Sequence, residues 1–89
     1  MFTAEHILIA SGSEPRGGNF EGADLCLSSD DFFSMTELPE SIVVLGGGYI
    51  GVELAQIMQS MGVNTTLVAR STPLKFLDRD ILDLLLAEM

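Results

Sequence analysis

One stretch decides how this chain folds: the glycine-rich segment GGGYIG at residues 46–51. It follows the apolar run IVVL at residues 42–45 and opens an amphipathic segment over residues 49–61. An apolar strand, a tight glycine turn and a helix form the context in which the spacing GxGxxG indicates a dinucleotide site. The sequence therefore predicts a nucleotide-binding strand-turn-helix unit. A glycine-rich turn that binds no ligand is the alternative.

The three spaced glycines of this stretch have different expected roles. Gly46 permits the sharp turn out of the strand, and Gly51 lets the helix lie close to the strand. Gly48 has no side chain, so a pyrophosphate can approach the backbone there. The first turn of the helix, with Tyr49 and Ile50, directs its N–H groups and the positive end of the helix dipole toward the phosphates.

The segment after the glycine turn is expected to continue as a helix and a second strand. Apolar residues at three- and four-residue spacings predict one helix face, made of Ile50, Leu54, Ile57, Met58 and Met61. Gly62 is expected to end the helix as a left-handed cap. Residues 65–69 predict a strand parallel to the first, joined through a right-handed crossover. The predicted fold class is α/β, a Rossmann-type βαβ unit in a partial parallel sheet with flanking helices.

A further helix is expected near the end of the sequence. It begins at Asp78 or Asp80 and covers residues 81–88. Its apolar face contains Ile81, Leu84 and Leu85, widened by Leu82 and Leu86. So wide a face predicts cover from elements outside this sequence.

The first residues of the chain read as a strand and a short helix. Residues 6–10 are apolar without alternation, which predicts a short, fully buried strand. His6 opens this strand, and a structural role is expected for it. Further on, Ser29 precedes an acidic and aromatic segment and is the expected cap of a short helix.

An irregular connector is expected between these two elements. Residues 15–28 show no sustained period, and Cys26 within them has no basic neighbour in sequence that would activate it. A buried, inert Cys26 is therefore expected. The pair Leu38-Pro39 ends the short helix, and we place a domain boundary there, between residues 1–38 and residues 39–89.

Composition excludes several function classes. The chain has 89 residues, one domain or a piece of a larger protein, and its formal charge of −9 argues against nucleic acid and anionic membrane surfaces. Its longest apolar run is too short to span a bilayer, and no secretory signal is visible. The single cysteine permits no internal disulfide and fits a reducing compartment.

Basic residues gather just after the second predicted strand. Ala69 and Arg70 stand where an acidic residue would contact the ribose 2′-hydroxyl of NAD, and Lys75 follows in the same loop. A guanidinium can form a forked hydrogen-bond pair with a 2′-phosphate, and an ammonium can add a point charge. This pattern indicates NADP(H). The alternative is a solvated loop whose bases balance Asp78 and Asp80, and Arg79 is assigned to that solvated role.

Two further polar side chains lie on the predicted nucleotide helix. Tyr49 and Glu53 are one turn apart and project on one side. They could cover and contact the nicotinamide pocket, or Tyr49 could pack while Glu53 is solvated. No metal-ligand cluster and no catalytic triad or carboxylate pair is recognisable in the sequence.

Several stretches together carry a family resemblance: HILIASG at residues 6–12, SDDFF at 29–33, LP at 38–39, GGGYIGVELA at 46–55, Arg70, and PLK at 73–75. They resemble the flavoprotein pyridine nucleotide-disulfide oxidoreductases. Among these, the glutathione reductases are most similar and the large thioredoxin reductases come next. The resemblance covers essentially the whole chain and implies a fragment of a fold with two dinucleotide-binding domains, one for FAD and one for NADPH.

The resemblance assigns roles to individual residues. It implies that Ser11 and Gly12 lie near the adenosine end of FAD. It implies that Tyr49 shields the flavin until the nicotinamide enters, and that Glu53 lies near the nicotinamide. Arg70 matches the first of two 2′-phosphate ligands in NADPH-using members.

The sequence also departs from the family pattern. Lys75 stands where arginine is more usual, and the connector at residues 16–19 lacks the usual proline. The family's FAD-binding GxGxxG, its redox cysteine pair and its dimerisation region with the acid-base histidine are absent from these residues. We therefore expect no catalytic residue here and no disulfide reduction by this chain alone.

The expected parent is a cytoplasmic homodimer, with mitochondria or another organelle left open, that passes electrons from NADPH through FAD to a disulfide such as glutathione disulfide. A thioredoxin reductase, another family member or a non-catalytic nucleotide-binding module are the alternatives.

Overall fold

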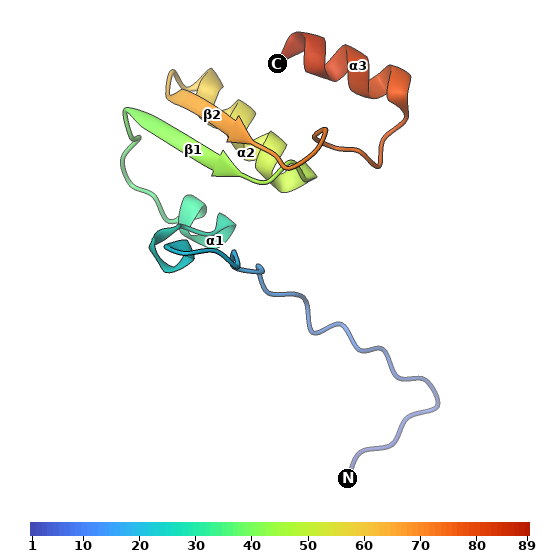
Figure 1. Cartoon of the computed structure of the whole chain (residues 1–89). Coiled ribbons are helices and arrows are strands. Elements are labelled where there is room, and N and C mark those ends of the chain that lie inside the picture. Colours follow the sequence, from blue (N-terminus) through green and yellow to red (C-terminus); the bar gives the residue numbers. More distant parts are fainter. The chain divides into compact units, whose positions relative to one another are not determined.

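A computed structural model describes residues 1–89, which form two compact units, Met1–Ser34 and Met35–Met89 (Figure 1). The first unit contains a 3-10 helix, η1 (Ala23–Leu25), and a short α-helix, α1 (Ser29–Phe33). The second unit contains β1 (Ser41–Leu45), α2 (Tyr49–Ser60), β2 (Asn64–Val68) and α3 (Arg79–Glu88).

Helix α1 begins with a reciprocal pair of hydrogen bonds. The backbone N–H of Asp31 donates to the Ser28 hydroxyl at 3.3 Å, and the Ser28 backbone N–H donates to the Asp31 carboxylate at 2.7 Å. The predicted cap at Ser29 is therefore wrong by one residue. A capping box needs an acidic or amide side chain three residues after the cap, and only Ser28 has one, because Phe32 occupies that position relative to Ser29.

The predicted buried strand at residues 6–10 is not formed. These residues have no regular structure and are exposed, with Leu8 exposing 89% of its surface and His6 exposed as well. A strand is stable only when its backbone pairs with a neighbour. The single sheet of the structure contains only β1 and β2, so residues 6–10 have no neighbouring strand to pair with.

The expected burial of Cys26 is also wrong. Cys26 is a free, exposed cysteine that directly follows η1. A single 3-10 turn with no buried residue offers no core in which the thiol could be enclosed.

The second unit confirms the predicted strand-helix-strand order. Strands β1 and β2 are parallel, with residues paired in register from Ser41 opposite Asn64 to Leu45 opposite Val68. The predicted strands at residues 42–45 and 65–69 agree with the observed ones to within one residue. Parallel neighbours need a crossover connection, which α2 provides (Figure 1).

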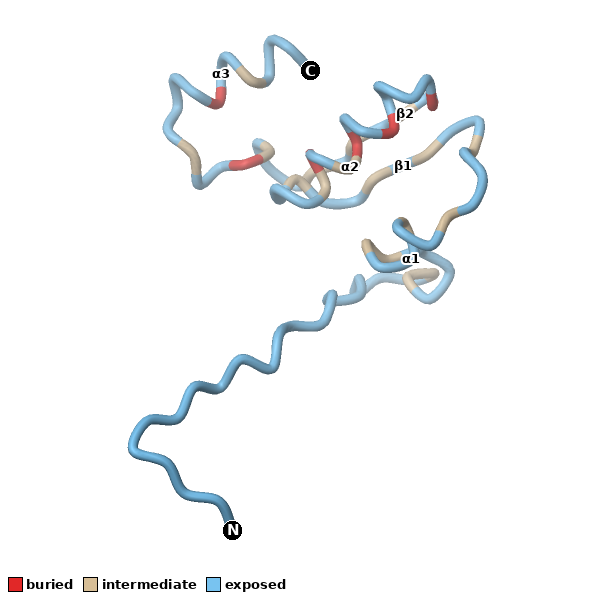
Figure 2. The backbone as a smooth tube through the Cα atoms, turned by 180° about the vertical axis from the view of Figure 1, so that it is seen from behind, coloured by how far each residue is buried: buried red, intermediate tan, exposed pale blue.

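Helix α2 is buried along a different stripe from the predicted one, and the two share only Met58. Its buried residues are Val52, Ala55 and Met58 (Figure 2). Of the predicted apolar face, Met58 is buried and Leu54 is half-buried, whereas Ile50, Ile57 and Met61 are exposed. A sheet of two strands supports only one stripe of a helix, so the adjacent apolar residues remain in solvent.

The end of α2 confirms the predicted left-handed cap. Gly62 has φ of 86°, and its N–H donates to the Gln59 carbonyl at 2.9 Å. The Val63 N–H donates to the Met58 carbonyl at 3.1 Å. This pair of bonds defines a Schellman motif, and both Val63 and Met58 are buried.

Helix α3 has the predicted start at Asp78, whose carboxylate accepts from the Asp80 N–H at 3.0 Å. Its packing differs from the prediction, because Leu82 is the buried residue while Ile81 and Leu84 are exposed and Leu85 is half-buried. Leu82 packs in a small core with Val52 and Leu74. Half-buried Leu67 of β2, Leu77 and Leu85 pack against this core.

Candidate dinucleotide-binding site

The turn between β1 and α2 depends on two glycines. Gly46 has φ of 131°, which side-chain-bearing residues rarely adopt, and its N–H donates to the Val68 carbonyl at 2.9 Å. A Cβ atom on Gly51 would overlap the carbonyl oxygen of Gly46. The predicted sharp turn and close helix-strand approach are therefore confirmed.

The start of α2 is open and offers free hydrogen-bond donors. A Cβ atom added to Gly48 would have no atom within 4 Å. Gly48 provides no side-chain cap, and none of the backbone N–H groups from Gly48 to Gly51 has an acceptor within the chain. The first bonded N–H is that of Val52, which donates to the Gly48 carbonyl at 3.0 Å. Free N–H groups at the positive end of a helix suit an anion such as a phosphate.

The loop after β2 is tied directly to this turn. The backbone N–H of Leu74 donates to the carbonyl oxygen of Gly47 at 2.7 Å. A Cβ atom on Gly47 would lie 2.9 Å from the Ala69 Cβ and 3.0 Å from the Pro73 Cα. Sequence reasoning assigned no role to Gly47 or Leu74. The available signal was a third glycine in the turn and a leucine that follows Pro73 in the loop.

Arg70 and Lys75 lie on this loop with free charges. Both are exposed, and neither forms an ion pair. The loop is anchored to the glycine turn between these two residues, through Leu74. The structure thus attaches the two predicted halves of the site, the glycine turn and the basic loop, to each other.

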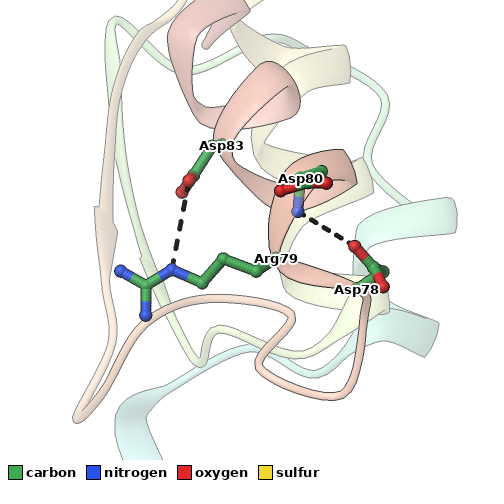
Figure 3. A network of polar contacts seen from close by, with 4 residues as sticks. All are labelled: Asp78, Arg79, Asp80 and Asp83. Carbon is green, nitrogen blue, oxygen red and sulfur yellow. Dashed lines mark hydrogen bonds and ion pairs between the residues drawn. The ribbon is translucent and has the colours of Figure 1, made fainter.

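The acidic residues near the loop have other contacts (Figure 3). Asp78 caps α3 by accepting from the Asp80 N–H. The one ion pair of the structure joins Arg79 Nε to Asp83 Oδ2 at 3.9 Å, with both side chains strongly exposed. Neither Asp78 nor Asp80 forms an ion pair with Arg70 or Lys75, and Arg79 has the solvated position expected for it.

The other predicted site residues lie outside the glycine turn and the basic loop. Tyr49 and Glu53 are both exposed on α2, and their side chains form no hydrogen bond. Ser11 and Gly12 belong to the first unit, where both are exposed and Gly12 has φ of 76°. The structure does not relate Ser11 or Gly12 to the glycine turn.

Neither unit gathers three or more histidine, cysteine, aspartate or glutamate side chains in a group that could hold a metal ion.

No helix in the structure combines the length and the apolar character needed to cross a membrane.

A parallel βαβ unit with an open glycine turn and flanking helices defines the class: a Rossmann-type fragment of an FAD/NAD(P)-binding domain. The sequence profile described as "Pyridine nucleotide-disulphide oxidoreductase" matches residues 1–89, and the chain belongs to this family. It is also similar to the glutathione reductase of Yarrowia lipolytica (strain CLIB 122 / E 150), with 41% identity over 70 residues. The match covers 79% of this chain and 15% of that relative, so the chain spans a small part of it.

Proposed function

We propose that this chain is the NADPH-binding portion of an FAD-dependent disulfide reductase similar to glutathione reductase. The observation that carries the proposal is the hydrogen bond from Leu74 to Gly47, which ties the basic loop to the glycine turn. In the proposed organisation, residues 39–89 form the first βαβα of the NADP(H) domain. Residues 1–38 form the end of the FAD domain and the connector.

The glycine turn of the second unit suits the pyrophosphate of NADPH. Gly46, Gly48 and Gly51 would shape the turn that receives the pyrophosphate, and the free N–H groups that include that of Ile50 would donate to it. The open space at Gly48 supports this, because nothing within 4 Å occupies the position of its missing side chain. These are the features that a dinucleotide phosphate requires.

The 2′-phosphate would be held by the basic loop. Arg70 offers a forked pair of donors and Lys75 a point charge, and neither is committed to a carboxylate. An NAD-binding site would have an acidic residue at the end of β2, where this chain has Ala69 and Arg70. The charge at this position therefore favours NADPH over NADH.

The other proposed contacts follow from family membership. Tyr49 would shield the flavin, Glu53 would lie beside the nicotinamide, and Ser11 and Gly12 would contact FAD. When bound, NADPH supplies the hydride that reduces the flavin, whose electrons then pass to a disulfide. The chain has a single cysteine, Cys26, so the redox pair would have to come from other residues of the parent protein.

The parent is proposed to reduce glutathione disulfide, because the relative with 41% identity is a glutathione reductase. A cytoplasmic homodimer that binds neither nucleic acid nor membranes is proposed for it. The charge of −9 supports the absence of nucleic acid as a partner.

Calorimetric titration of the chain with NADPH and with NADH, at low and at moderate salt, tests the proposal. The expected result is tighter binding of NADPH, with a preference that weakens as salt screens the 2′-phosphate contacts. Equal affinities for the two nucleotides in the folded chain, as judged by circular dichroism, would contradict it.

A further inference from the structure

One loop residue has an unusual backbone conformation. Leu74 has φ of 52° and is the single non-glycine residue of the chain with positive φ. It is also 6% exposed, although its neighbour Lys75 lies in solvent. A leucine adopts this conformation rarely, and it persists where surrounding contacts hold it in place.

Contacts from three directions hold Leu74. Its N–H donates to the Gly47 carbonyl at 2.7 Å, and its own carbonyl accepts from the Leu77 N–H at 2.9 Å. Its side chain packs with Val52 of α2 and Leu82 of α3. The glycine turn, the nucleotide helix and the last helix therefore all meet at this residue.

We propose that Leu74 is a positioning residue for cofactor selection. The inference rests on the proposed function. The left-handed backbone turns the Leu74 side chain into the core, and the next residue, Lys75, follows on the outside. Leu74 thereby fixes the loop that carries Arg70 and Lys75 against the glycine turn. It acts on the 2′-phosphate, which NADPH alone has, and not on the pyrophosphate that NADPH and NADH share.

Helix α3 also contributes to the packing that holds the basic loop in place. Leu82 is 5% exposed and shares the small core with Leu74, against which the loop residue Leu77 also packs. Leu82 has no place in the proposed contacts with the cofactor. Its effect on NADPH binding would therefore be transmitted through the packing of the loop, which separates a positioning role from a direct one.

The test measures the affinities of the chain for NADPH and NADH by calorimetry in three variants. Leu74→Ala and Leu82→Ala each remove packing around the loop. Leu84→Ala is the matched control, because Leu84 lies on the same helix and is 73% exposed. We expect the NADPH-to-NADH preference to fall about tenfold in the first two variants, the loss of roughly one charge-assisted hydrogen bond, with NADH affinity unchanged. The control keeps the preference.

The ratio of affinities distinguishes positioning from general destabilisation. A partly unfolded variant loses affinity for both nucleotides by the same factor, which leaves the ratio unchanged. Leu74→Met, which conserves most of the packing, should restore the preference. A wild-type chain that prefers NADPH, with an unchanged ratio in folded Leu74→Ala, would overturn this inference and leave the proposed function standing. A wild-type chain without preference would instead overturn the proposed function.

Amide hydrogen exchange gives a reading that needs no cofactor. Leu74→Ala should speed exchange over residues 69–77 while β1 and β2 keep their protection. Unchanged exchange in this loop would show that Leu74 does not fix it, whatever the nucleotide titrations give.

Discussion

Gly51 lies directly against Gly46: a Cβ atom added to Gly51 would overlap the carbonyl oxygen of Gly46 and approach Val44 Cγ1 to 3.6 Å. The first turn of α2 is therefore pressed onto the end of β1 at a point where no side chain fits. By contrast, a Cβ atom on Gly48 would meet nothing within 4 Å. One glycine of the turn serves packing, and the other leaves space beside the free N–H groups.

Gly51→Val should destabilise the fold. The added side chain must push α2 away from the turn, and overpacking of this kind costs about 1–3 kcal/mol. Urea unfolding of the two proteins measures the difference. Gln56→Val is the control, because it places the same side chain on an exposed position of α2. Equal losses of stability in both variants would show that the Gly51 contact is unimportant.

Gly48→Val should lower stability by about 1 kcal/mol, because glycine is favoured over valine at the N-cap of α2, and should weaken nucleotide binding more strongly. The Gly48 backbone is extended, with φ of −78° and ψ of 173°, so valine fits it without strain. The side chain would occupy the space proposed for the pyrophosphate, so affinity for NADPH and NADH should fall together, by roughly tenfold or more. Calorimetry and urea unfolding on the same sample check both parts. If the variant lost stability but bound both nucleotides like the parent chain, Gly48 would serve the fold and not the pyrophosphate.

Arg70→Glu should reduce NADPH affinity far more than NADH affinity. The substitution removes a forked donor and sets a negative charge near the 2′-phosphate, a loss of about 10- to 100-fold for charge-assisted contacts. NADH lacks that phosphate and should bind about as before. Arg79→Glu is the matched control, because Arg79 is strongly exposed and pairs with Asp83 instead. Equal losses for both nucleotides in Arg70→Glu would remove the phosphate assignment.

Gly62→Ala should cost about 1–2 kcal/mol of stability, the strain of a left-handed alanine. The position has φ of 86° and no atom within 4 Å of an added Cβ, so backbone strain is the whole effect. Gly62→Asn should be milder, because asparagine tolerates this conformation better. Thermal unfolding of the three proteins would rank them, and an alanine variant as stable as the parent would exclude a strained cap.

Local signals in the sequence were sufficient for the strand-turn-helix-strand unit. The apolar run before Gly46, the spacing of the glycines and the cap at Gly62 each depend on neighbours in sequence. The buried face of α2 was predicted less well, because the stripe that is enclosed depends on how wide the sheet beneath it is. The strand expected at residues 6–10 failed for a similar reason, since strand formation depends on a partner.

In the candidate site, too, some residues could be predicted from the sequence and others could not. Gly46, Gly48 and Gly51 could be recognised from spacing, and Arg70 and Lys75 from their position after a strand. The bond between Leu74 and Gly47 could not, because it joins residues far apart in sequence through backbone atoms that every residue type has. Leu74, Phe76 and Leu77 all stand in this loop without a helical or strand period, so the sequence does not show which of them is buried.

The capping box of α1 predicts a pH dependence. The backbone N–H of Ser28, and then its hydroxyl, donate to the Asp31 carboxylate and hold the pKa of Asp31 below its ordinary value. A group whose pKa is lowered by folding stabilises the folded state above its unfolded pKa and loses that effect as pH falls through the folded pKa. The contribution of the box to α1 should therefore be complete at neutral pH and disappear in acid, below the ordinary aspartate range.

An NMR titration of the Asp31 carboxyl carbon checks this account. Ser28→Ala should raise the pKa of Asp31 part of the way, because the hydroxyl donor is lost while the backbone donor remains. Ser28→Thr keeps a hydroxyl at the cap and should titrate like the parent chain. If Ser28→Ala and the parent chain titrate identically, the hydrogen bond from the Ser28 hydroxyl to the Asp31 carboxylate does not stabilise the charged form of Asp31.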